Sequence, residues 1–283
     1  MAAVAIRTMS AAELALAADW AAAEGWNPGL DDPLAFHAAD PDGFLVGTLD
    51  GAPVASISVV RYAADFGFLG FYIVAPAQRG RGYGLRLWQA GVDRLAGRNV
   101  GLDGVVAQQD NYRRSGFRLA WRNVRHQGVL PPGGAAAPAG VTVVDAKTLP
   151  FPMIADYDRR FFPAPRPAFL SLWIGLPRHV AVAAVADGNL AGLAVLRPCR
   201  TGFKLGPLYA RDTGIAAALV GALAPHAGDA PVALDVPEFN AAAVRLARDL
   251  GLAPAFETAR MYTGPDPEID RAALFGVTTF ELG

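Results

Sequence analysis

The stretch of residues 74–84 has the residue types and the spacing to bind a phosphate group. It reads Val-Ala-Pro-Ala-Gln-Arg-Gly-Arg-Gly-Tyr-Gly and lies between a predicted strand and a predicted helix. Its three glycines stand at alternate positions, where they permit positive φ and leave backbone N–H groups unobstructed. Amides at the positive end of a helix dipole attract an anion, and Arg79 and Arg81 add positive charge. The stretch therefore predicts a pyrophosphate cradle.

Two well-known nucleotide-binding motifs do not fit this stretch. A P-loop requires Gly-Lys-Ser/Thr, whereas here the glycines are followed by Tyr83 and Leu85. The dinucleotide pattern GxGxxG has a different glycine spacing and needs a later acidic residue. A glycine-rich turn without a ligand remains the alternative to the cradle.

A central strand and a helix are expected to position the cradle. Residues 66–74 are apolar on both faces, which is typical of a strand buried on both sides. After the glycines, Leu85, Trp88, Val92 and Leu95 follow a helical spacing, so we expect them to form one buried stripe. Strand, turn and helix in this order direct the amides of the turn at one spot.

Local signals define the elements that precede the central strand. Ser10 and Glu13 form a capping box, which predicts a helix that runs to about Glu24. Two β-rich segments on either side of Asp50-Gly51 predict a hairpin, because this dipeptide favours a tight turn with positive φ.

Length and composition predict two domains. The chain has 283 residues, which corresponds to about two domains at roughly 150 residues each. Residues 131–140 are rich in Pro, Gly and Ala, so we interpret them as a linker between domains at 1–130 and 141–283.

The second half repeats the order of elements in the first. Asp-Gly hairpin signals occur at residues 50–51 and 187–188, which are 137 residues apart (187 − 50). Two glycines that end helices, Gly116 and Gly251, are 135 residues apart (251 − 116). The similar offsets indicate an internal duplication.

Composition argues against several classes of protein. Lys+Arg 25 against Asp+Glu 26 leaves a net charge of −1, whereas proteins that bind nucleic acid are usually basic. A single cysteine, Cys199, and four scattered histidines predict neither a disulfide nor a metal site. Apolar runs are far shorter than the roughly 20 residues of a membrane-spanning helix, and the N-terminus is unlike a signal peptide. We expect a cytoplasmic protein, with no membrane or nucleic-acid partner, in which Cys199 is a buried structural thiol.

Two motifs resemble those of the GNAT superfamily of acyl-CoA N-acyltransferases. Residues 79–84, Arg-Gly-Arg-Gly-Tyr-Gly, resemble its R/Q-x-x-G-x-G/A motif, and residues 112–117 resemble its Tyr-x-x-x-Gly-Phe signature. The resemblance covers about residues 3–126, and the second half resembles a degenerate GNAT domain. Residues 24–29 and 275–281 also resemble a bacterial tandem-GNAT group.

The resemblance implies a fold and a co-substrate. Each half would be an α/β (α+β) domain with a mixed, mostly antiparallel sheet flanked by helices. Acetyl-CoA would lie between two splayed strands, with its pantetheine along residues 71–74 and its pyrophosphate on the cradle. The implied cofactor-binding residues are Ile73, Val74, Arg79, Gly80, Arg81, Gly82, Tyr83, Gly84 and Asn111.

The resemblance also implies direct transfer of the acyl group. The acceptor amine would attack the thioester, and a backbone N–H near Val74 would stabilise the developing oxyanion. Tyr112 would protonate the leaving thiolate. The alternative interpretation of Tyr112 is an aromatic side chain that fills the core beside Phe117.

A carboxylate is expected to assist the acceptor amine. Glu24 is the favoured candidate, because it adjoins a segment that commonly lines the acceptor site in the family. Asp31, Asp65 and Asp103 are the alternatives. Arg260 faces either a cleft between the domains or the surface.

The chain departs from the family pattern in both halves. Where the family carries an Asn that contacts the cofactor, this chain has Val105, and Asn111 is the available substitute. The second half has Asn240 at the matching place but Ala247 in place of the tyrosine, and its turn at 209–214 has one glycine. We therefore expect one cofactor site, in the first half.

These observations favour an N-acyltransferase that acetylates the amine of a small molecule with acetyl-CoA, as a monomer or a homodimer. The alternative is a non-catalytic acyl-CoA sensor or interaction module. A third interpretation is an acyl chain longer than acetyl, which an apolar tunnel beyond the thioester would support.

Overall fold

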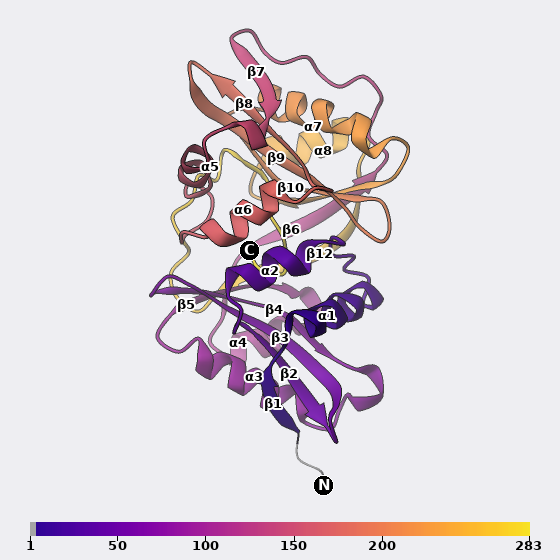
Figure 1. Cartoon of the computed structure of the whole chain (residues 1–283), viewed down its shortest axis with the longest axis vertical. Helices are drawn as coiled ribbons and strands as arrows, with labels where there is room; N and C mark the ends of the chain where they lie inside the picture. Colours follow the sequence, from indigo (N-terminus) through magenta and orange to yellow (C-terminus); the bar gives the residue numbers. More distant parts are fainter. Residues whose placement is uncertain (1–3) are drawn as a thin grey trace.

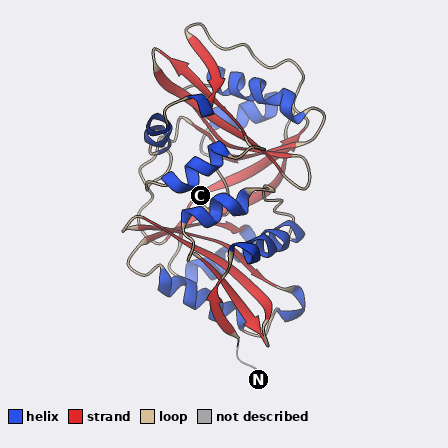
Figure 2. Cartoon of the chain, in the orientation of Figure 1, coloured by secondary structure: helices blue, strands red, loops and turns tan. Residues whose placement is uncertain are grey.

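The computed structural model describes residues 4–283, and its two halves lie one above the other along the longest axis (Figure 1). One 13-stranded sheet runs through both halves, with helices on both faces (Figure 2). Two pairs of strands are parallel and the others antiparallel, so the sheet is mixed, as predicted. The first three residues of the predicted domain at 1–130 lie outside the described residues.

The elements follow one another in a similar order in the two halves. The first half has β1 (Ala5–Thr8), α1 (Ala11–Ala23), α2 (Asp32–Ala39), β2 (Phe44–Leu49), β3 (Ala52–Tyr62), β4 (Phe66–Val74), α3 (Tyr83–Arg94), β5 (Asn99–Val105), α4 (Gln109–Arg114) and β6 (Arg118–Gly128). The second half has β7 (Val141–Asp145), α5 (Phe151–Asp158), α6 (Pro167–Gly175), β8 (Val180–Ala186), β9 (Asn189–Pro198), β10 (Phe203–Ala210), α7 (Thr213–Ala227), β11 (Val232–Pro237), α8 (Ala241–Asp249), β12 (Ala253–Tyr262) and β13 (Leu274–Gly276).

The local signals of the first half are confirmed. The Ser10 hydroxyl accepts from the Glu13 amide and the Glu13 carboxylate accepts from the Ser10 amide, which is the predicted capping box of α1. Asp50 and Gly51 have φ of 50° and 83°, as a two-residue hairpin between β2 and β3 requires. Strand β4 lies between β3 and β5 and is buried on both faces.

The buried face of α3 differs from the predicted stripe, because Leu85 is 69% exposed. The buried residues of the helix are Gly84, Leu87, Trp88 and Gly91. A Cβ on Gly91 would lie 2.8 Å from a methyl group of Val59 in β3. Two glycines therefore let α3 approach the sheet closely, and a pattern of large apolar residues does not reveal a face of this kind.

The two halves exchange strands. Strand β12 of the second half lies between β5 and β6, and β6 of the first half lies between β12 and β11. All three pairings are antiparallel. Each half is therefore completed by a strand from the other. The predicted linker lies between β6 and β7, and the division of the chain into domains there stays a prediction.

One face of the sheet carries a core that belongs to both halves. Helices α1, α2, α5 and α6 contribute to it, and Phe36 of α2 stacks on Phe169 and Trp173 of α6 with ring centroids 6.4 and 6.0 Å apart. On the other face, α3 covers the first half and α7 and α8 cover the second, in two separate cores. The shared core fixes the position of one half relative to the other. It therefore determines which residues of each half can lie at a common site.

Other expectations concern the cysteine and the membrane. Cys199 is buried, and burial raises the pKa of its thiol to about 11, as expected for a structural thiol. No helix within residues 4–283 is long and apolar enough to cross a membrane.

Candidate active site

The first half contains a V-shaped opening between two neighbouring strands. Strands β4 and β5 pair in parallel up to Leu69 and Leu102 and share no ladder beyond them. Strand β4 is irregular at this point, because its register against β3 shifts and Phe71 has a φ of 45°. A cavity of about 620 Å³ occupies the V and extends to the turn before α3.

The predicted cradle lies at the mouth of this cavity. Gly80 and Gly82 have φ of 76° and 80°, and a Cβ on either would meet no atom within 4 Å. Gly82 is the N-cap of α3, and as a glycine it offers no side chain to the first amides of the helix. These free amides, next to open space, are the arrangement that binds an anion.

Arg79 holds the cradle against the strand that precedes it. Its Nε donates to the Val74 carbonyl oxygen at 2.9 Å, and its guanidinium forms an ion pair with Glu24 at the end of α1. Glu24 and Arg79 both line the cavity. The predicted acceptor carboxylate is therefore engaged by the predicted cofactor-binding arginine.

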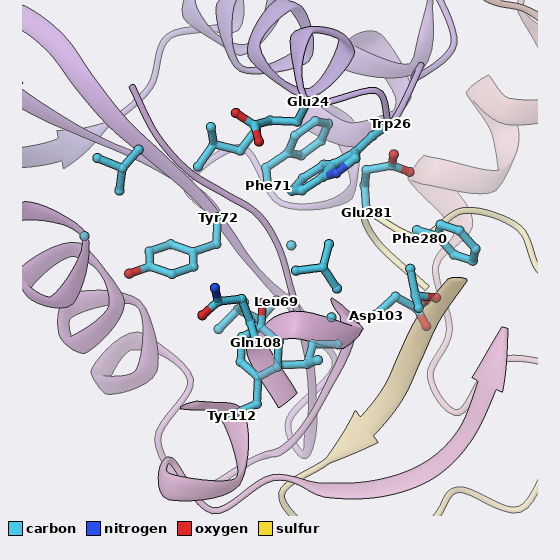
Figure 3. Close-up of a pocket in the computed structure, with 18 of the residues that line it drawn as sticks. Glu24, Trp26, Leu69, Phe71, Tyr72, Asp103, Gln108, Tyr112, Phe280 and Glu281 are labelled. Carbon is cyan, nitrogen blue, oxygen red and sulfur yellow. The ribbon is translucent and has the colours of Figure 1, made fainter. Parts of the chain in front are cut away.

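Tyr112 of α4 reaches the cavity between a helix and a strand. Its ring stacks on Trp88 of α3 at a centroid distance of 5.6 Å, and a Cβ on Gly104 would collide with it. Burial raises the pKa of Tyr112 to about 12, so the phenol is protonated at neutral pH. Figure 3 shows Tyr112 on the side of the cavity where Tyr72 and Gln108 also lie.

Aromatic side chains line the other side of the cavity (Figure 3). They are Trp26 from the turn after α1, Phe71 from β4 and Phe280 from the last segment of the chain. Phe256 from β12 also lines the cavity, and its ring centroid lies 6.3 Å from that of Phe280. The turn that carries Trp26 is fixed on the second half, because the Asn27 amide donates to the Thr201 carbonyl oxygen at 2.9 Å. This wall is therefore built by both halves.

Arg125 of β6 supports the aromatic wall from behind. Its guanidinium lies 5.6 Å from the ring of Phe256 and 5.0 Å from that of Phe280, and it donates to the Trp26 carbonyl oxygen at 2.9 Å. The same group forms a bidentate pair with Asp235 of β11 at 2.7 and 2.8 Å. Burial lowers the pKa of Arg125, but the Asp235 carboxylate more than offsets this and keeps the guanidinium charged.

Asp103 of β5 lines the cavity and is paired within the protein. Both its oxygens accept from Arg260 of β12, at 2.9 and 2.5 Å, and Asn123 donates to it at 2.8 Å. Burial alone would lower the pKa of Arg260, but Asp103 raises it, so the arginine keeps its charge. Arg260 is 6% exposed, so its interpretation as a surface residue is wrong.

Glu281 brings a third carboxylate to the cavity. It is 3% exposed and follows Phe280 in the last segment of the chain. The Thr279 hydroxyl donates to one carboxylate oxygen, and Lys204 Nζ lies 3.8 Å from the other. Both charges are buried, so Lys204 balances Glu281.

The remaining predicted residues divide into two groups. Those that line the cavity are Ile73, Val74, Gly80, Gly82, Tyr83 and Gly84. Arg81 and Asn111 are exposed and are not among the lining residues. Asn111 donates to Gln108, which does line the cavity, at 2.5 Å. The roles of all these residues stay predictions.

Sequence analysis named Arg260 as a candidate for the cleft but missed the other residues that β12 contributes. Phe256, Thr258 and Arg260 alternate along β12, and the alternation places them on one face of the strand. That pattern was available in the sequence. What was missing was the exchange of strands, which brings this face to the cavity of the first half.

The matching V of the second half is filled by the chain itself. Strands β10 and β11 pair in parallel from Phe203 to Leu205, and β13 then pairs with β10. The turn after β10 also differs, because Asp212 caps α7 by accepting from the Ile215 amide at 2.9 Å. A carboxylate thus takes the position that the cradle leaves open in the first half.

Both halves of the chain match acetyltransferase family models. The model of the acetyltransferase (GNAT) family matches residues 12–117, and that of an acetyltransferase (GNAT) domain matches residues 154–276. Holothin acyltransferase of Pseudoalteromonas sp. (strain SANK 73390) is 34% identical over 267 residues, which are 94% of this chain and 90% of that protein. The chain belongs to the GNAT family. It is thus an acyltransferase by family, and both halves carry GNAT domains.

Two solved structures share the fold over nearly the whole chain. A putative acetyltransferase from Pyrococcus horikoshii has a TM-score of 0.81 at 18% identity and covers 99% of this chain and 96% of its own. A tandem GNAT protein from the clavulanic acid biosynthesis pathway has a TM-score of 0.67 at 16% identity. The match covers 93% of this chain and 100% of that protein's chain. The predicted tandem of GNAT domains is confirmed.

Proposed function

We propose that this GNAT protein transfers an acetyl group from acetyl-CoA to the amine of a small molecule. The observation that carries the proposal is the open V between β4 and β5, whose cavity of about 620 Å³ leads from the cradle to Tyr112. Acetyl-CoA supplies the activated acyl group as a thioester. Its pyrophosphate binds the amides of the cradle, and its pantetheine lies along the unpaired edge of β4.

Tyr112 acts on the leaving sulfur. The pKa of its phenol is about 12, whereas that of a thiol is near 8.5. Complete proton transfer to the sulfur is therefore uphill, and the phenol acts mainly as a hydrogen-bond donor that stabilises the negative charge as it develops. A backbone amide near Val74 stabilises the oxyanion. The amine attacks directly, so no residue of the chain is acylated.

The acceptor is a small molecule that fits beside the aromatic wall. The similar protein from Pseudoalteromonas is named for the acylation of holothin, and holothin is accordingly the first acceptor to test. Its relation to this chain extends over 94% of the residues, so it includes most of both halves.

Titration calorimetry tests the cradle with a matched pair of glycine variants. Gly82 and Gly97 both have a φ of 80°, and a Cβ on either meets nothing within 4 Å. Gly82→Glu and Gly97→Glu therefore introduce the same strain and the same charge before and after α3. We expect acetyl-CoA to bind the wild type and Gly97→Glu, and Gly82→Glu to lose at least about tenfold in affinity, because its carboxylate repels the pyrophosphate.

Thiol release from acetyl-CoA in the presence of holothin, and separately of a series of small amines, then measures transfer. Equal binding by the two glycine variants would contradict the cradle. Binding of acetyl-CoA without thiol release for any amine would favour the acyl-CoA sensor over the enzyme. Thiol release from longer acyl-CoAs but not from acetyl-CoA would show that the transferred acyl group is longer than acetyl.

A further inference from the structure

The carboxylates that line the cavity give it no net negative charge that could bind a cationic acceptor. Three carboxylates line the cavity of residues 4–283, and each has a cationic partner: Glu24 has Arg79, Asp103 has Arg260 and Glu281 has Lys204. Asp103 and Glu281 also accept hydrogen bonds from Asn123 and Thr279. Their charges are thus already compensated inside the protein.

An alkylammonium group would lose its hydration in this cavity without gaining an ion pair. An aliphatic amine has a pKa near 10 and is charged at neutral pH. Burial of an unpaired charge is unfavourable, so such a group tends to give up its proton instead. To bind Asp103 or Glu281, such an amine would have to displace a buried arginine or lysine. Glu24 lies at the cradle, where Arg79 engages it.

The walls of this part of the cavity fit a flat ring. Trp26, Phe71, Phe256 and Phe280 surround it, and aromatic side chains pack favourably against planar groups. Thr258 is 2% exposed and lines the cavity, and its hydroxyl has no hydrogen-bond partner among residues 4–283. The hydroxyl is therefore free to bond with a polar group of a ligand.

We propose that the acceptor is a planar, uncharged amine whose nitrogen is attached to an aromatic or heteroaromatic ring. This inference rests on the proposed function and specifies its substrate class. Such amines are too weakly basic to be protonated at neutral pH, because their lone pair is delocalised into the ring. The aromatic wall holds the ring, and the Thr258 hydroxyl bonds with one of its polar substituents.

An uncharged acceptor also removes the need for a strong base in the cavity. The nitrogen forms a bond to the acyl carbon as the carbon–sulfur bond breaks. The nitrogen loses one proton and the sulfur gains one, so the balanced reaction releases no proton. An ammonium acceptor must lose a further proton before attack, and transfer to it releases one proton per turnover. Among residues 4–283 each carboxylate that lines the cavity is paired, which is consistent with the first case.

Binding to the protein in complex with CoA separates recognition from reactivity. Aniline and benzylamine carry the same ring, but only benzylamine is charged at neutral pH. We expect aniline to bind the CoA complex at least about tenfold more tightly by calorimetry. Benzylamine should bind more tightly as the pH rises, by up to about tenfold per pH unit, because its uncharged fraction increases. Cyclohexylamine, which is neither flat nor uncharged, should bind more weakly than both.

A charge introduced into the wall should reverse the preference. Trp26 is only half-buried and lies in a turn, so Trp26→Glu and Trp26→Leu are both expected to fold, and their unfolding temperatures check this. Trp26→Glu should favour benzylamine over aniline at least about tenfold more than Trp26→Leu does. Leu34→Ala, at an exposed position of α2 away from the cavity, should leave the preference unchanged.

Three outcomes separate this inference from the proposed function. Failure of CoA to bind at all would overturn the proposed function. Binding of CoA with a preference of the wild type for benzylamine would overturn the inference alone. Release of one proton per thiol during transfer to the best acceptor, measured with a pH indicator at low buffer concentration, would also overturn the inference alone.

Discussion

The two halves carry the same V between parallel strands, but only the first V is open. In the first half, β4 and β5 diverge and leave a cavity with uncovered amides at its mouth. In the second half, β13 pairs with β10 inside the V and Asp212 caps the following helix. Main-chain atoms thus occupy the second V, and a carboxylate lies where the first half leaves room for a phosphate.

The last segment of the chain connects these two sites. Gly206 and Gly70 lie 136 residues apart (206 − 70) at matching irregularities in β10 and β4. A Cβ on Gly206 would lie 2.6 Å from the carbonyl oxygens of Val277 and Thr278, and one on Gly70 would collide with that of Glu281. The segment that fills the second V therefore continues into the wall of the first. The second half has become a support that brings residues to the first.

Among the variants considered, substitution of Arg125 should have the largest effect on stability and on acceptor binding, because this residue connects the second half to the open site. Arg125→Leu leaves Asp235 buried without a partner, which typically costs about 3–5 kcal/mol of unfolding free energy, and it frees the rings of Phe256 and Phe280. We expect a lower unfolding temperature and a higher KM for the acceptor, with the affinity for acetyl-CoA unchanged.

The matched control is another arginine on the same strand. Arg122 pairs with Glu257 at 2.7 Å, but both side chains are more than a third exposed, and such pairs contribute only about 0–1 kcal/mol. If Arg122→Leu lowered stability and acceptor affinity as much as Arg125→Leu, the support that we assign to Arg125 would be disproved.

The next effect compares two tyrosines with the same pKa. Burial raises the pKa of both Tyr112 and Tyr157 to about 12, but only Tyr112 lines the cavity. Tyr112→Phe should lower kcat by about 10²-fold or more with little change in acetyl-CoA affinity, whereas Tyr157→Phe should keep kcat. Because both phenols are protonated well above neutral pH, no fall in kcat from Tyr112 ionisation is expected there. A kcat for Tyr112→Phe close to that of wild type would assign Tyr112 to packing alone.

The smallest effect concerns the closed site. Asp212→Ala removes the cap of α7 and should cost about 0.5–2 kcal/mol of stability, seen as a small fall in unfolding temperature. The second V should still bind no acetyl-CoA, because β13 remains in it. A binding stoichiometry that rises from one to two in calorimetry would show that the cap, and not the inserted strand, closes the second site.

Short-range patterns in the sequence predicted the parts of the site that lie close together along the chain. Glycine occurs at positions 80 and 82 of the cradle because the backbone there has a positive φ. The Asp-Gly pairs likewise occur where a tight hairpin turn requires a positive φ. Tyr112 was found through a motif within six residues. In each case the physical requirement acts on neighbours, so a single sequence can carry it.

Long-range arrangement was not predictable in the same way. The predicted buried stripe that includes Leu85 was wrong. The buried face of α3 includes two glycines, whereas a periodicity of large apolar residues does not detect small ones. The sequence predicts Glu24 as the acceptor carboxylate but does not reveal its pairing with Arg79, 55 residues later. Phe256 depends on the exchange of strands between the halves, and Phe280 depends on the path of the last segment of the chain. No local pattern encodes either.

The exchange of strands also has a consequence for synthesis on the ribosome. The edge of β5, complete at Val105, pairs with β12, which begins at Ala253. During translation the first half therefore presents an unpaired strand edge until more than half of the polypeptide has followed it, and such an edge can pair with other chains. Contacts so distant in sequence also slow folding. The nascent chain is thus most exposed to aggregation in the interval between these two strands, and a chaperone that shields this edge would raise the yield of folded protein.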